Sequence, residues 1–179
     1  FATAVAGHHL GIHPFDQPNV QESKANTSRI LEDVRAGRKL PQTRTDRRAA
    51  TAAVLDLLVE AEPGRYVAIL AYLSPSARVE AALRGLRRAI LMHCCVATTA
   101  GYGPRYLHST GQLHKGGPNS GLFLLMLEAM SPDLPVPGAH YSFGTLATAQ
   151  AVGDLQSLQS HARKAVRIDG FDLGNSPRD

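Results

Sequence analysis

The chain of 179 residues is long enough for one domain with a sizeable core, and its 44% hydrophobic and 19% charged residues exclude disordered and fibrous proteins. The net charge of +4 arises from 19 basic residues scattered among 15 acidic ones. With 6% aromatic residues and no Trp, this pattern argues against a nucleic-acid partner and favours a mildly basic enzyme for small anionic substrates.

Helical periodicity dominates the first third of the chain. Helices are expected over residues 1–10, 20–34 and 47–61. Gly11 and Pro14 end the first helix. After a turn, Asn19 or Asp16 caps the second helix and Gly37 closes it. The apolar face of the third helix consists of Val54, Leu55, Leu58 and Val59.

Residues 40–46 are polar, contain one proline and form the best internal boundary. We therefore expect a helical segment over residues 1–40 and an α/β domain over residues 47–173. Adjacent Cys94 and Cys95 lie in an apolar run, where a disulfide between them is awkward and burial as small hydrophobes is expected.

The rest of the chain alternates strands and helices. Buried strands are expected over residues 66–73, 94–99, 122–127 and 166–168. Ser74 and Pro75 begin a helix after the first strand. Its apolar face consists of Val79, Ala82, Leu83, Leu86 and Ile90. A Pro-rich loop over residues 131–138 precedes a helix over residues 143–162. This order predicts an α/β layered fold with a mostly parallel sheet of about four strands.

A Gly-rich segment over residues 101–119 follows the second expected strand, at the edge where open α/β sheets bind ligands. Its residues suit a sugar phosphate, because amides, hydroxyls and cations bind anions and histidine moves protons. The candidate catalytic residues are His108 and His114, and the candidate substrate-binding residues are Arg105, Ser109, Thr110, Gln112 and Lys115. A hydrogen-bonded surface loop with a structural histidine is an equally supported alternative.

Lys24 and Asp16, taken by residue type alone, are ordinary surface and turn residues. Their context changes that interpretation. The string GIHPFDQPNVQESK at residues 11–24 resembles the signature near the C-terminus of glucose-6-phosphate isomerases, roughly N-x-F-D-Q-x-G-V-x-x-x-K. His13 replaces the first Asn and Asn19 replaces the Gly.

Two further blocks carry a more specific resemblance. Residues 101–121 (GYGPRYLHSTGQLHKGGPNSG) and 142–154 (SFGTLATAQAVGD) are similar to the downstream region of bifunctional transaldolase/glucose-6-phosphate isomerases. The blocks and the segments between them cover nearly the whole chain. Transaldolase chemistry itself is not expected, because it needs a Schiff-base Lys on a barrel strand, and no repeated strand and helix units occur here.

The resemblance implies a sugar isomerase (SIS) type of α/β fold. It also implies interconversion of glucose 6-phosphate and fructose 6-phosphate through an enediol or enediolate, with no cofactor and no metal. Lys24 matches the family's catalytic Lys in its spacing from Phe-Asp-Gln, which implies a role in ring opening or contact with O5. The family's catalytic His lies upstream of that block, so His108 and His114 remain candidates on chemical grounds alone.

The family's base Glu and main phosphate loop also lie upstream of the Lys motif. The glutamates of this chain occupy no matching context: Glu22, Glu32, Glu60, Glu62, Glu80 and Glu128. We therefore expect a C-terminal portion that needs the remaining N-terminal part of the enzyme for activity. The chain opens without Met inside an expected helix, which agrees with more protein upstream. A noncatalytic sugar-phosphate-binding module and a structural C-terminal domain are the alternatives, and homo-oligomer formation stays open.

No apolar stretch approaches the roughly 18 residues that span a bilayer, and no secretory leader pattern opens the chain. These features and the cysteine usage predict a cytoplasmic protein without a membrane partner.

Overall fold

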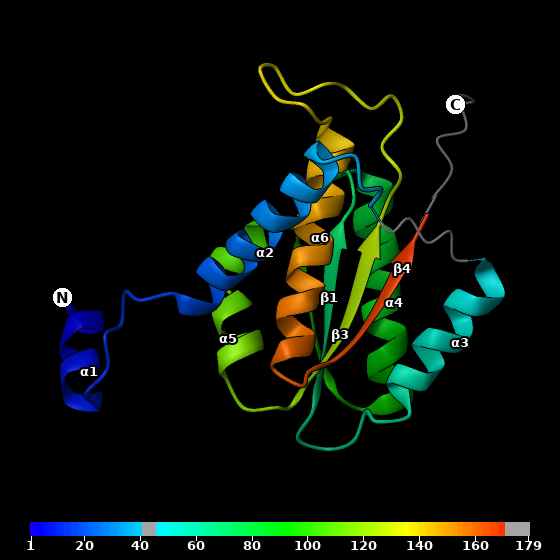
Figure 1. Cartoon of the computed structure of the whole chain (residues 1–179). Helices are drawn as coiled ribbons and strands as arrows, with labels where there is room; N and C mark the ends of the chain where they lie inside the picture. The colour runs from blue at the N-terminus through cyan, green and yellow to red at the C-terminus, as the bar shows by residue number, and fades with distance from the viewer. Residues whose placement is uncertain (41–45, 171–179) are drawn as a thin grey trace.

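Four apolar segments of the chain form one parallel sheet at the centre of an α/β fold (Figure 1). The computed structural model describes residues 1–40 and 46–170. The strands are β1 (Tyr66–Tyr72), β2 (Ala97–Tyr102), β3 (Gly121–Leu127) and β4 (Lys164–Asp169). Their order is β2-β1-β3-β4, so β1 and β3 are central and are buried on both faces. Continuous apolar sequence suits such two-sided burial.

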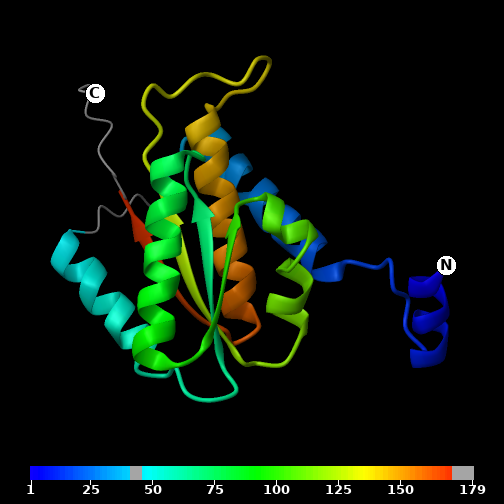
Figure 2. The ribbon, with the colours of Figure 1, turned by 180° about the vertical axis from the view of Figure 1, so that it is seen from behind.

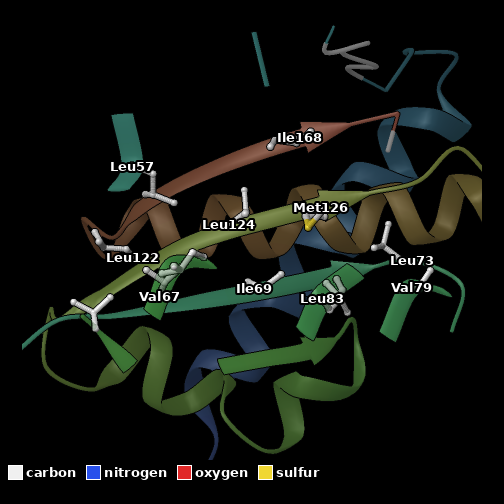
Figure 3. Close-up of a cluster of buried hydrophobic side chains, with 13 residues drawn as sticks. Leu57, Val67, Ile69, Leu73, Val79, Leu83, Leu122, Leu124, Met126 and Ile168 are labelled. Carbon is white, nitrogen blue, oxygen red and sulfur yellow. The ribbon is translucent and has the colours of Figure 1, made fainter. Parts of the chain in front are cut away.

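Helices cover both faces of the sheet (Figures 1 and 2). One face carries α3 (Arg47–Leu58) and α4 (Ala77–Cys94), and the other carries α5 (Gly111–Gly116) and α6 (Phe143–Ser160). Figure 3 shows the core under α3 and α4, where Leu57 and Leu83 lie in one buried cluster with Ile69 and Leu124 of the central strands. Alternate side chains of β1 and β3 therefore pack into the hydrophobic cores on the two faces of the sheet, as the two-residue period of a strand requires.

Helix α2 (Pro18–Arg35) packs mainly on α6 and also contacts α5. It therefore forms an outer layer over the helices on that face of the sheet. Ile30 of α2 is buried with Ala149 and Val152 of α6. By contrast, α1 (Ala2–Leu10) lies apart from the rest, with Gly7 its single buried residue (Figure 1). The expected boundary over residues 40–46 falls mostly on residues 41–45, which lie outside the described residues.

The strands β1 and β3 and the helix α6 lie where the sequence predicts them, whereas several other boundaries differ. Helix α3 ends at Leu58, three residues earlier than expected, and β4 extends beyond the expected 166–168 at both ends. Gln17, and neither Asn19 nor Asp16, is the N-cap of α2, because Pro18 takes the first helical position. Ser76 rather than Ser74 caps α4, and its side chain accepts the Val79 amide at 3.2 Å. Helix α4 then continues to Cys94, so β2 begins three residues later than expected.

The expected apolar face of α3 was partly wrong. Leu55 and Val59 are exposed, while Leu57 is fully buried. The stripe that meets the core consists of Ala50, Val54, Leu57, Leu58 and Ala61, which recur at helical spacing. Likewise the expected burial of the cysteines was wrong: Cys94 is half-buried, Cys95 is exposed in a left-handed conformation after α4, and both thiols are free.

Candidate functional site

The topological switch point lies between β1 and β3, because the chain leaves β1 for α4 on one face and leaves β3 for α6 on the other. The chain's own carboxylates bond backbone amides at this edge, one in the segment between β1 and α4 and one at the start of α6. Glu128, after β3, accepts the Ser74 amide at 2.7 Å. Asp133 accepts the Gly144 amide at 2.7 Å, in the position where the start of α6 could otherwise hold an anion. Internal hydrogen bonds therefore fill much of the carboxyl edge.

The segment over residues 101–119 is folded, so the expected long loop was wrong. After β2 it forms the short 3-10 helix η1 (Arg105–His108) and then α5. Two of its glycines make room for aromatic rings: a Cβ on Gly101 would lie 2.7 Å from the Cβ of Tyr106, and one on Gly103 would overlap the Tyr72 ring. These glycines thus serve internal packing.

A buried charged cluster joins α2, α5 and α6. Lys115 of α5 forms an ion pair with Asp154 of α6, and the two side chains are 1% and 0% exposed. The Lys115 ammonium also donates to Ser23 Oγ of α2 at 2.7 Å. The Ser23 hydroxyl lies within reach of the Asn19 carbonyl at 3.2 Å and of Asp154 Oδ1 at 3.3 Å. Burial raises the pKa of Asp154 and lowers the pKa of Lys115, because desolvation penalises both charges.

Further polar side chains join α2 to α5 and α6 nearer the surface than the buried ion pair. Gln112 holds Asn19 through two bonds: its Nε2 donates to Asn19 Oδ1 at 2.6 Å, and its Oε1 accepts the Asn19 amide at 3.3 Å. His161, at the end of α6, lies 2.8 Å from Glu22 Oε2. Burial alone would raise the pKa of Glu22, but hydrogen bonds from His161 and Ser160 outweigh it and lower that pKa. The start of α2 is therefore tied to both α5 and α6.

His114 faces the interior beside the ion pair. It is 2% exposed, its Nδ1 lies 2.9 Å from the Tyr66 hydroxyl, and its ring packs edge-on against Phe123. Burial, helped by the neighbouring Lys115 charge, lowers the pKa of His114 to about 4. His114 is therefore a neutral core residue at neutral pH.

Comparisons with known proteins support the fold alone. No family model matches the chain, and no curated protein matches it. A crystal structure of a hypothetical protein, TT0462 from Thermus thermophilus, is similar, with a TM-score of 0.55 and 15% sequence identity. The match covers 66% of this chain and 32% of that one, so this chain spans about a third of the length of its neighbour. The similarity agrees with the layered α/β architecture.

The candidate site residues divide into exposed and enclosed groups. Lys24 on α2 and His108 at the end of η1 are exposed, and neither makes a hydrogen bond or ion pair within residues 1–40 and 46–170. Arg105 is exposed with its guanidinium 5.6 Å from the Tyr102 ring centroid, and exposed Ser109 donates to the Tyr106 carbonyl at 3.1 Å.

The four other candidates are less accessible. Thr110 is half-buried at the start of α5, and its side chain caps no amide there. Gln112 is engaged by Asn19, and His114 and Lys115 are enclosed. A ligand would reach the last two only if the cluster opened. The exposed candidates are therefore the ones a solvent-side ligand can contact.

Sequence reasoning missed the partners of the enclosed residues. Ser23, Asp154 and His161 looked unremarkable because their partners lie far away in the sequence: Ser23 is 92 positions from Lys115 and 131 from Asp154, and His161 is 142 from Asn19. One signal was present: Ser23 and Asp154 both lie inside the blocks that carry the family resemblance.

An apolar cleft of about 610 Å³ lies on the opposite face, between α3 and α4. Its lining includes Val54, Leu83 and Met126, with Arg47 and Asp169 as its charged members. It contains none of the predicted site residues. The described segments contain no group of side chains placed to hold a metal ion, and no helix in them combines the length and apolarity that crossing a membrane requires.

Proposed function

We propose that this chain is the C-terminal portion of a sugar-phosphate isomerase that interconverts glucose 6-phosphate and fructose 6-phosphate through an enediol or enediolate. The observation that carries the proposal is the meeting of the three resembling blocks. Ser23, Lys115 and Asp154 come one from each block, and they form a single buried cluster. The segments that carry the resemblance thus form one packed unit.

In this proposal Lys24 is the ring-opening residue. It follows Ser23 directly, so it projects to solvent from a helix whose inner face the buried cluster holds. An ammonium there donates to the ring oxygen or to a neighbouring hydroxyl while the C1–O5 bond breaks. His108 is the better of the two histidine candidates because it is exposed and free to exchange protons with solvent or substrate.

Arg105 and Ser109, which lie in the same short segment as His108, are exposed groups suited to an anion, since one carries a fixed charge and the other a hydroxyl. The remaining N-terminal part of the enzyme supplies the C1/C2 base and the main phosphate loop in this proposal. No redox cofactor or metal takes part. The sugar phosphate and that N-terminal part are therefore the proposed partners, in the cytoplasm.

A noncatalytic or structural C-terminal module of a bifunctional transaldolase/isomerase is the second candidate. The burial of His114 and Lys115 favours it, because these two groups stabilise helix contacts instead of facing a ligand. Both polar atoms of the Gln112 side-chain amide likewise form hydrogen bonds with Asn19.

Calorimetric titration of the purified chain separates these candidates. We expect saturable binding of fructose 6-phosphate, no binding of unphosphorylated fructose, and weaker binding by His108→Ala than by His140→Ala, an exposed histidine in the loop before α6. Silence with fructose 6-phosphate would favour the structural module. The isolated chain should show no isomerase turnover in a coupled assay, and turnover at an enzyme-like rate would contradict the need for an N-terminal part.

A further inference from the structure

The inner face of α2 carries buried polar side chains beside its apolar ones, whereas most helices bury an apolar stripe alone. Asn19, Ser23 and Thr27 recur every four residues and so lie on one face of the helix. Asn19 bonds Gln112, and Ser23 bonds Lys115 and Asp154. Apolar burial on α2 comes from Val20, beside Asn19 at its start, and from Ile30 further along.

Two glycines let the neighbouring helices approach this polar face closely. A Cβ on Gly153 of α6 would lie 2.9 Å from both the amide nitrogen and Oγ1 of Thr27. A Cβ on Gly116 of α5 would lie 2.9 Å from Asn19 Oδ1. A side chain on Gly153 would meet the backbone of α2 and push this helix outward, whereas one on Gly116 would displace the Asn19 side-chain amide.

The buried ion pair of Lys115 and Asp154 contributes little net stability, because both charges lose their hydration. Taking an ammonium and a carboxylate fully out of water costs several kcal/mol per ion, and apolar pairs of similar volume often serve stability as well or better. Its contacts instead define the orientation of α2. Lys115 must reach Ser23 Oγ and Asp154 Oδ1 together, which fixes the rotation of α2 about its axis and its position along that axis.

We propose that Ser23, Lys115 and Asp154 are positioning residues that hold α2 in one rotational setting, so that Lys24 presents its ammonium to the sugar phosphate from a fixed point. The inference rests on the proposed function for its ligand, and on the packing of α2 for its geometry. Successive residues of a helix are about 100° apart, so a rotation of α2 that released Ser23 would carry the root of Lys24 with it.

The first test needs no ligand. Amide hydrogen exchange is measured for wild type, for Ser23→Ala, and for Lys115→Met/Asp154→Leu, which replaces the charges with apolar side chains. We expect protection of the α2 amides to fall at least about tenfold in both variants, with the β3 amides unchanged. Unchanged protection in α2, or an equal loss in β3, would overturn the positioning role. Ser23→Ala keeps the test available if the double variant does not fold.

The second test is a double-mutant cycle on fructose 6-phosphate affinity, measured by calorimetry. Lys24→Ala, Ser23→Ala and their combination are compared with wild type. Because the cluster acts through Lys24, we expect the combination to bind no more weakly than Lys24→Ala alone. Losses that simply add would show that Ser23 supports binding by another route and would overturn the inference. If wild type does not bind fructose 6-phosphate, the proposed function is contradicted. Hydrogen exchange would still decide whether the cluster positions α2.

Discussion

Gly153 of α6 and Thr27 of α2 cross so closely that a Cβ on Gly153 would lie 2.9 Å from the Thr27 amide nitrogen. Gly153→Ala should therefore lower the free energy of unfolding by about 1–3 kcal/mol, because the two helices must separate to admit a methyl group. Urea denaturation measures the change.

Gly85→Ala is the matched control for this substitution. Gly85 lies inside α4, is exposed, and has nothing within 4 Å of its ideal Cβ. Alanine there should raise the free energy of unfolding by about 0.5–1 kcal/mol through its helix propensity. Equal effects of the two substitutions would show that α2 and α6 are not in close contact in solution.

The buried ion pair should respond differently to single and double replacement. Lys115→Met leaves Asp154 buried without its cation, so we expect a loss of about 3–5 kcal/mol in chemical denaturation. Lys115→Met/Asp154→Leu should recover most of this loss, because no uncompensated charge remains. Lys39→Met, at an exposed lysine, should change stability by less than about 0.5 kcal/mol. A double variant as unstable as the single one would contradict the buried pairing.

Acid should weaken the fold through His114. Its pKa in the folded protein is about 4, against 6.5 for an ordinary histidine. Between these values the unfolded chain binds a proton that the folded chain does not, so this contribution is complete above pH 6.5 and is lost as the pH falls toward 4. The loss amounts to about 3 kcal/mol at about 1.4 kcal/mol per pKa unit.

Thermal unfolding of His114→Gln across this pH range isolates that contribution from other titrating groups. The difference in stability between wild type and His114→Gln should shrink as the pH falls. His108→Gln, the same change at an exposed histidine, should alter stability by less than about 0.5 kcal/mol. A constant difference between wild type and His114→Gln would mean that His114 titrates normally in the fold.

The sheet was predictable because β1 and β3 are continuous apolar runs whose burial does not depend on distant detail. The start of β2 was not, since the Cys94 and Cys95 region reads equally well as strand or helix end. His114 and Lys115 looked like loop residues because their partners, Tyr66 and Asp154, are far away in the sequence. Local pattern cannot show such partners. Lys24, whose exposure follows from its own residue type, lies where its sequence predicts.

Calorimetric titration with fructose 6-phosphate, comparing wild type, Lys24→Ala and Lys39→Ala, tests the proposed sugar-phosphate site most directly. Lys39 is an exposed lysine beyond the end of α2, so its removal changes net charge equally without touching the motif. Wild type and Lys39→Ala should bind with similar affinity, and Lys24→Ala at least about tenfold more weakly, as expected for the loss of one charged hydrogen bond. Equal affinities for Lys24→Ala and Lys39→Ala, or no saturable binding by wild type, would contradict the account.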